Sequence, residues 1–156
     1  SRWAGLLDPY GNGVGIISVP PADAVPKVEA DATTGSIVWL DMTVPDAAKA
    51  RDYYQAVVGW SFEEFAMEDN AGSYSDFSML DTSGNAVAGI CHARGPNTGL
   101  PPVWMHYLPV GDLDESLRRG EAGGGKVLRR GPDTEDHPKT VAVQDPLGVS
   151  FALAQG

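Results

Sequence analysis

The feature that most constrains this chain is an internal repeat. Residues 36–93 and 103–154 show the same order of predicted elements. Each segment begins with a strand, continues with an amphipathic helix (47–58 in the first, 113–122 in the second) and ends with three strands, so each reads βαβββ. A chain of 156 residues can bury one core made from both units. The sequence therefore predicts an α+β fold built from a repeated unit.

A short stretch at the start resembles the end of such a unit. Residues 3–8 and 13–18 predict two strands around the turn Asp8-Pro9-Tyr10-Gly11, and the last hairpin of the second unit turns at Asp145-Pro146-Leu147-Gly148. An isolated hairpin is marginal in water, so we expect it to pack against the main domain or against a second copy of the chain. The expected parts are a hairpin, a linker and a two-unit domain: residues 1–18, 19–35 and 36–156.

Composition bears on location and partners. The formal net charge of −10 disfavours binding to nucleic acid and to anionic membranes. A single cysteine, Cys91, rules out a disulfide within the chain and fits a reducing compartment, so we expect a cytoplasmic protein. The sequence shows no signal peptide and no apolar run of membrane-spanning length.

The two units, the stretch VPDAAKARDYYQAVVGWSFEE and the terminal DPLGVSFAL together resemble the vicinal oxygen chelate superfamily, also called the glyoxalase/bleomycin-resistance/dioxygenase fold. Within it, the chain looks most like glyoxalase-like proteins that have four βαβββ units in two domains. The resemblance implies a curved sheet from each unit, two sheets paired around a cleft, and helices outside. A chain of that kind would explain the opening hairpin as the end of a preceding domain.

Metal-using members of this superfamily hold a divalent ion with His, Gln or Glu on the first and last strands of each unit. Carried over one at a time, those positions fall on Trp39, Ala88, Met105 and Ala152. Trp and Ala side chains do not bind metals, and a thioether is a poor ligand for a hard ion. We therefore expect no metal and no other cofactor. The alternative is a metal-dependent lyase, isomerase or dioxygenase that uses Asp41 and a histidine as unusual ligands.

The histidines give that alternative little support. Alternation puts His106 on the side of the strand that faces the helix, where we expect a hydrogen-bonded core residue. His92 ends a predicted strand and His137 lies in a predicted loop, so we expect both to be solvated.

Alternation along the first strand of each unit places other side chains in the predicted cleft. Two aromatic rings and a thioether there suit a flat apolar or cationic group. The predicted ligand-binding residues are Trp39, Asp41, Thr43, Met105 and Tyr107.

Asp41 is the one ionisable residue in that set. It can contact the ligand or act as an acid or base, or it can be held in a hydrogen-bond network or by a cation such as Arg94 or Arg118. The function predicted from the sequence is a metal-free, glyoxalase-like protein that binds a small aromatic or cationic molecule, as drug-sequestering or resistance proteins do. We expect a homodimer, and the sequence leaves open whether any reaction is catalysed.

Overall fold

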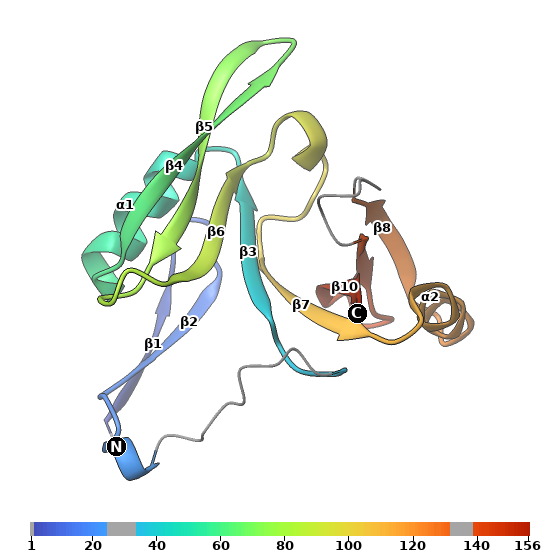
Figure 1. Cartoon of the computed structure of the whole chain (residues 1–156), viewed down its shortest axis with the longest axis horizontal. Coiled ribbons are helices and arrows are strands. Elements are labelled where there is room, and N and C mark those ends of the chain that lie inside the picture. The colour runs from blue at the N-terminus through green and yellow to red at the C-terminus, as the bar shows by residue number, and fades with distance from the viewer. Residues whose placement is uncertain (1, 25–33, 132–138) are drawn as a thin grey trace.

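The computed structural model describes residues 2–24, 34–131 and 139–156, and Figure 1 shows them arranged as one small sheet and one large sheet. The small sheet is an antiparallel hairpin of β1 (Trp3–Leu7) and β2 (Gly13–Ile17), followed by the 3-10 turn η1 (Ala22–Ala24). Residues 25–33 of the predicted linker lie outside the described residues.

Both βαβββ units are present. The first consists of β3 (Trp39–Val44), α1 (Ala47–Val58), β4 (Ser61–Asp69), β5 (Gly72–Leu80) and β6 (Ala86–His92). The turn η2 (Gly95–Asn97) follows. The second consists of β7 (Trp104–Val110), α2 (Leu113–Ala122), β8 (Lys126–Arg130), β9 (Thr140–Gln144) and β10 (Ser150–Gln155). The predicted α+β fold is therefore confirmed.

The large sheet has the strand order β4-β5-β6-β3-β7-β10-β9-β8. The first strands of the two units, β3 and β7, pair antiparallel at its centre, with Trp39 opposite Tyr107. Within each unit the first strand runs parallel to the last, β3 to β6 and β7 to β10. The two units are therefore related by an approximate two-fold axis between β3 and β7.

The helices begin where the sequence predicts because both N-caps are aspartates. The Asp46 carboxylate accepts the backbone N–H of Lys49 at 3.0 Å, and Asp112 accepts that of Glu115 at 2.9 Å. Gly59 ends α1 in the left-handed conformation, with φ of 82°. Neither helix in the described residues has the length and apolar character that crossing a membrane would require.

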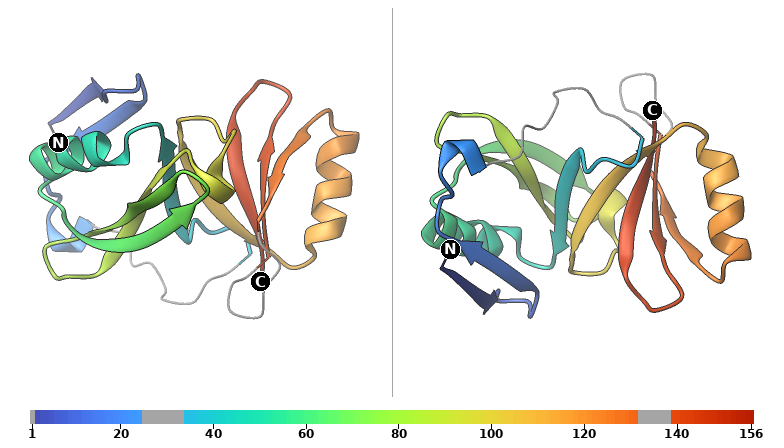
Figure 2. Two further views of the ribbon diagram at one scale, coloured as in Figure 1. Left: turned by 90° about the horizontal axis from the view of Figure 1, so that it is seen from above. Right: turned by 90° about the horizontal axis from the view of Figure 1, so that it is seen from below.

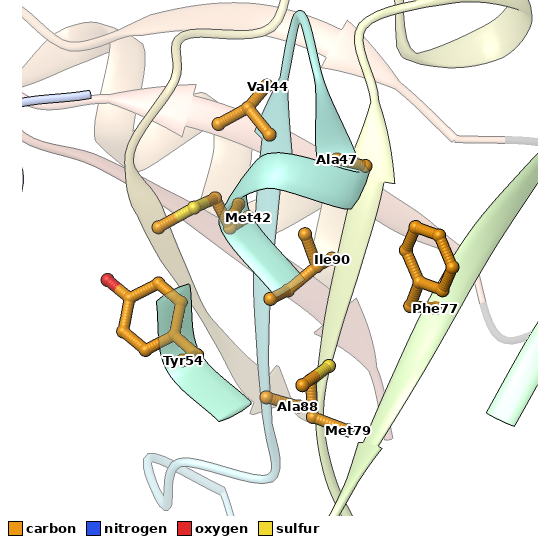
Figure 3. Packing of buried hydrophobic residues seen from close by; sticks show 9 residues of the cluster. Met42, Val44, Ala47, Tyr54, Phe77, Met79, Ala88 and Ile90 are labelled. Atoms are coloured by element: carbon orange, nitrogen blue, oxygen red, sulfur yellow. The ribbon is translucent and has the colours of Figure 1, made fainter. Parts of the chain in front are cut away.

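Both helices cover the same face of the large sheet, at opposite ends of the molecule (Figure 2). Under α1, Tyr54 packs with strand residues that include Met42 and Ile90 (Figure 3). Under α2, Leu113 and Leu117 pack with a second set: Val141, Val143 and Leu153. Burial of these apolar side chains stabilises each helix on its own unit.

Among the described residues, no α-helix covers the opposite face of the sheet, and we call it the helix-free face. Met105, Ala142 and Ala152 are buried on it. Arg129 on β8 donates from Nη1 to Oδ1 of Asn97 in η2, the turn between the two units, at 3.3 Å. Its charge also acts on Asp41 of β3 in the first unit. The helix-free faces of the two units therefore approach each other, as a fold that pairs two units requires.

Three hairpins share one type of turn. In each, a carboxylate oxygen accepts the backbone N–H groups of the residues two and four positions further on, at 2.8–2.9 Å. The aspartates are Asp8, Asp81 and Asp145. This shared geometry supports the proposal that β1–β2 corresponds to the last hairpin of a βαβββ unit.

The β1–β2 hairpin packs against α1, which is one of the two arrangements expected from the sequence. The Tyr54 hydroxyl donates to Oδ2 of buried Asp8 at 2.9 Å and accepts from Nε1 of Trp104 at 2.7 Å. Tyr10 donates to the Asp46 carbonyl at 2.8 Å. Burial acts to raise the pKa of Asp8, but its hydrogen bonds outweigh burial, so this pKa lies below the usual value.

Candidate functional site

Four of the five predicted ligand-binding residues come together at the centre of the helix-free face. Trp39 lies opposite Tyr107 and Asp41 lies opposite Met105 across the β3–β7 pair. The Asp41 carboxylate joins them, since Trp39 Nε1 donates to Oδ1 at 3.1 Å and the Tyr107 hydroxyl donates to Oδ2 at 3.3 Å. We call Trp39, Asp41, Met105 and Tyr107 the central site.

The fifth predicted residue, Thr43, lies further along β3. It is buried opposite Cys91 of β6, beyond the part of β3 that pairs with β7. Burial raises the pKa of the Cys91 thiol, so the thiol is protonated at neutral pH and is a poor nucleophile. Thr43 and Cys91 therefore border the central site as neutral groups.

Asp41 is the charged centre of this arrangement. Burial raises its pKa to about 6, although the hydrogen bonds from Trp39 and Tyr107 act to lower it. Asp76 nearby raises this pKa further, and Arg129 lowers it. A carboxyl with a pKa in this range can gain or lose a proton close to neutral pH, which is what an acid or base requires.

Gly89 makes room for the Asp41 side chain. It lies opposite Asp41 on β6, and a Cβ atom at Gly89 would collide with Asp41 Oδ1. Sequence reasoning missed this role, because a glycine within a strand pattern signals a close approach without saying which group approaches.

Arg129 is a second residue that sequence reasoning missed. Its Nε is buried and has no hydrogen-bond partner among the described residues. A β-bulge between Val127 and Arg129 shifts the register of β8, which places Arg129 opposite Ala142 on the helix-free face. The Arg129 side chain therefore brings an unused donor and a positive charge to the same face as Asp41.

The metal positions carried over from the superfamily need one correction. Trp39, Met105 and Ala152 lie on the helix-free face, but Ala88 is fully buried in the core under α1. An irregularity in the β5–β6 pair adds a residue before Ala88, so Gly89 rather than Ala88 holds the place that Ala152 holds in the second unit.

None of the residues at these places fits a divalent metal. Glycine, alanine and tryptophan have no side-chain atom that binds a metal ion, and the Met105 thioether is a poor ligand for a hard ion. Among the described residues, no three His, Cys, Asp or Glu side chains gather closely enough to hold an ion. The absence of a metal stays a prediction that a measurement must test.

Two of the expectations about histidines were wrong. His106 is exposed rather than tucked into the core. His92 is largely buried rather than solvated, with Nδ1 lying 3.3 Å from Oδ1 of Asp76 and the imidazole packed edge-on against Tyr74. His137 lies outside the described residues.

The chain belongs to the glyoxalase/bleomycin resistance protein/dioxygenase superfamily, whose family model matches residues 36–153. The resemblance predicted from the sequence is confirmed. "Putative glyoxylase CFP32" of Mycobacterium tuberculosis is 30% identical over 122 residues, which cover 78% of this chain and 46% of that protein. "Anthracycline biosynthesis protein DnrV" of Streptomyces peucetius is 28% identical over 131 residues, which cover 76% of this chain and 46% of that protein. The chain thus spans about half the length of both relatives.

Solved structures show the same fold at low sequence identity. A catechol 2,3-dioxygenase matches with a TM-score of 0.52 and 17% identity, covering 99% of this chain and 54% of that one. A methylmalonyl-CoA epimerase of Streptomyces coelicolor matches with a TM-score of 0.50 and 12% identity, covering 80% of this chain and 99% of that one. At these identities the likeness concerns the fold alone.

Proposed function

We propose that this chain is a metal-free, glyoxalase-like protein that binds a small planar molecule, aromatic or cationic, on the helix-free face. The predicted contacts are Trp39, Asp41, Thr43, Met105 and Tyr107. Two aromatic rings supply flat apolar surface, and the Met105 thioether adapts to the outline of a ring.

The observation that carries this proposal is the setting of the Asp41 carboxyl. Its two hydrogen-bond donors, Trp39 and Tyr107, are neutral, and both come from the aromatic residues that would hold the ligand. Burying the carboxylate is costly, and the charge of Arg129 offsets only part of that cost, since the pKa of Asp41 stays raised, at about 6. An ammonium group on a bound molecule would supply a further cation between two aromatic rings.

Two further observations support a ligand of this class. The unused Nε of Arg129 can donate to a carbonyl or phenolic oxygen on the ligand. A relative of this chain is named for anthracycline biosynthesis, and anthracyclines are flat aromatic molecules that carry such oxygens and an amino sugar. Daunorubicin, an anthracycline, is therefore a suitable probe.

The test is a titration with daunorubicin followed by tryptophan fluorescence and calorimetry. We expect saturable binding that Asp41→Asn weakens about tenfold, because the variant loses the charge that faces the ammonium group. Binding to the parent protein should also weaken as the pH falls through about 6, where Asp41 gains a proton.

Asp114→Asn is the matched control, because Asp114 is an exposed carboxylate in the first turn of α2. It removes the same charge from the chain and should leave the affinity unchanged. Equal affinity in the parent and Asp41→Asn proteins would refute the role of Asp41. No binding up to about 1 mM daunorubicin would refute the ligand class.

A further inference from the structure

A groove of about 510 Å³ lies on the other face of the sheet, between α2, β8 and the turn at Asp145. Its walls are mainly apolar: Leu117, Val127, Val143, Phe151 and Leu153. Asp41 and Tyr107 lie on the helix-free face, whereas these residues belong to the core under α2. The groove is therefore separate from the central site.

The approximate two-fold axis explains why this groove exists. Under α1, the rings of Tyr54 and Trp60 stack at 5.9 Å, and Trp104 packs edge-on against both. Counted from the two N-caps, Gly120 stands in α2 where Tyr54 stands in α1. Trp60 directly precedes β4 and Gly125 directly precedes β8, so Gly125 stands where Trp60 stands. The second unit thus lacks the two stacked rings that fill this space in the first.

Gly120 has no side chain to fill the groove, and the backbone conformation at this position does not require glycine. It lies inside α2 with no positive φ, and a Cβ atom built on it would meet nothing within 4 Å. Glycine within a helix is destabilising relative to alanine, and no neighbour of Gly120 requires it. Packing of the fold therefore does not explain this glycine, whereas an open groove does.

We propose that the groove under α2 is a second binding site, for a small flat aromatic molecule that carries an acidic group. The flat shape follows from the stacked rings at the equivalent place under α1. The volume lies within the range of about 300–1,000 Å³ typical of small-molecule sites, and apolar walls with a polar rim are typical of them too.

The acidic group follows from the charges on the rim. Lys126 and Arg119 line the groove, and Arg119 also contacts Glu115 at 3.4 Å. Of the two carboxylates that line it, Asp145 is engaged by the backbone N–H groups of Leu147 and Val149, and Glu121 is exposed on α2. Lys126, the first residue of β8, lines the groove directly after Gly125, so an acidic group on the ligand would meet it there.

The test uses the aromatic sulfonate 1-anilinonaphthalene-8-sulfonate, whose fluorescence rises in apolar sites. Gly120→Tyr restores the residue found in α1 and should weaken binding of this probe at least about tenfold. Gly120→Ala is the matched control, because a methyl group leaves most of the groove open and should change the affinity less than about twofold. Lys126→Gln should weaken binding about threefold or more, since it removes the cation from the rim.

Three results would overturn the proposal: no saturable binding to the parent protein, unchanged affinity in Gly120→Tyr, or equal losses in the tyrosine and alanine variants. If Gly120→Tyr does not fold, NMR of the parent protein decides. Shifts of the Gly120, Gly123 and Gly125 amides on adding the probe would support the site, and unmoved amides would refute it. Asp41→Asn should leave this binding unchanged, so failure of this site and failure of the central site are distinguishable.

Discussion

Asp41 is a buried carboxyl group that lowers the stability of the fold but is suited to binding a ligand or transferring a proton. Burial of its carboxyl group beside the bare backbone of Gly89 favours the neutral form, and this outweighs the hydrogen bonds from Trp39 and Tyr107, which favour the charged form. A buried hydrophobic residue there would cost the fold less. The carboxyl group is therefore better explained by binding or proton transfer than by stability.

The raised pKa of Asp41 makes a prediction about stability and pH. Because the folded pKa of about 6 lies above the unfolded value of about 4, the folded state binds the proton more tightly. This contribution to stability is present below the unfolded pKa and is lost as the pH rises through about 6. Between pH of about 4.5 and 7.5, the free energy of unfolding of the parent should fall by about 2 kcal/mol relative to Asp41→Asn.

Urea denaturation of both proteins at the two pH values measures this difference. The comparison cancels the titration of all the other carboxyl groups, provided that they are unaffected by the substitution. A difference that stays constant across the range would show that the pKa of Asp41 is not raised in the folded protein.

Gly89→Ala tests the packing behind Asp41. The added methyl group would collide with Asp41 Oδ1, so the carboxyl group must move away from Trp39. We expect the variant to lose about 1–3 kcal/mol of stability, measured by thermal and urea unfolding. Gly111→Ala is the control, because a Cβ atom there would meet nothing within 4 Å. Similar small losses in both variants would contradict the packing described for Asp41.

At the scale of elements, Tyr54 links the β1–β2 hairpin to the main domain. Its hydroxyl group accepts from Trp104 and donates to Asp8, so one residue of α1 joins β7 to the hairpin turn. Burial raises the pKa of Tyr54, which keeps the hydroxyl protonated and able to donate. The hairpin therefore completes the core under α1.

Asp8→Ala and Asp81→Ala compare two turns of the same type. Both substitutions remove the carboxylate that holds the turn, but Asp81 is in an exposed turn whereas Asp8 also accepts from Tyr54. We expect Asp8→Ala to cost about 1–3 kcal/mol more than Asp81→Ala in urea unfolding, because it leaves the Tyr54 hydroxyl buried without that acceptor.

A double-mutant cycle with Tyr54→Phe should assign the difference to the Asp8–Tyr54 pair. Removing residues 1–18 should also lower the melting temperature, because it uncovers Tyr54. An unchanged melting temperature would show that the hairpin does not support the domain.

The elements that the sequence predicted best are those with local signals. Asp46 and Asp112 mark the starts of both helices, and the predicted ranges 47–58 and 113–122 match the structure. Alternation assigned Trp39, Asp41, Met105 and Tyr107 to one face correctly because β3 and β7 pair without a bulge.

The errors arose where strands are irregular or where contacts are made over long distances. The irregularity in the β5–β6 pair moved the true equivalent from Ala88 to Gly89, and the bulge in β8 turned Arg129 onto the helix-free face. A bulge depends on the partner strand, so a single strand's pattern does not reveal it. Alternation places His106 on the face that the helices cover, yet His106 is exposed. The pattern of a strand does not show whether a helix reaches each residue on that face.

For the whole molecule, the two units have kept one fold and acquired different interiors. The first unit fills the space under its helix with Tyr54 and Trp60, and the hairpin covers it. The second has Gly120 and Gly125 at those places and leaves a groove. A repeated unit allows this, because each helix packs mainly on its own strands and can change without disturbing the other.

The predicted homodimer is a property of the whole molecule that remains to be measured. The hairpin exposes large apolar side chains, with Trp3, Leu7 and Ile17 at 76%, 71% and 66% exposure. Such side chains commonly mark an interface. We expect sedimentation equilibrium to give a dimer, and Leu7→Glu to give a monomer with an unchanged helix content. A monomeric parent protein at about 100 μM would contradict the prediction.

The most direct test of a metal-free central site is elemental analysis of protein purified without chelators. The resemblance to metal-using members of the superfamily implies ligand positions at Trp39, Gly89, Met105 and Ala152. Because these residues are poor ligands, we predict less than about 0.1 equivalent of Zn, Ni, Mn or Fe per chain. Added metal should likewise leave the melting temperature unchanged. About one equivalent of metal per chain, lost together with the melting temperature when a chelator is added, would contradict the metal-free site.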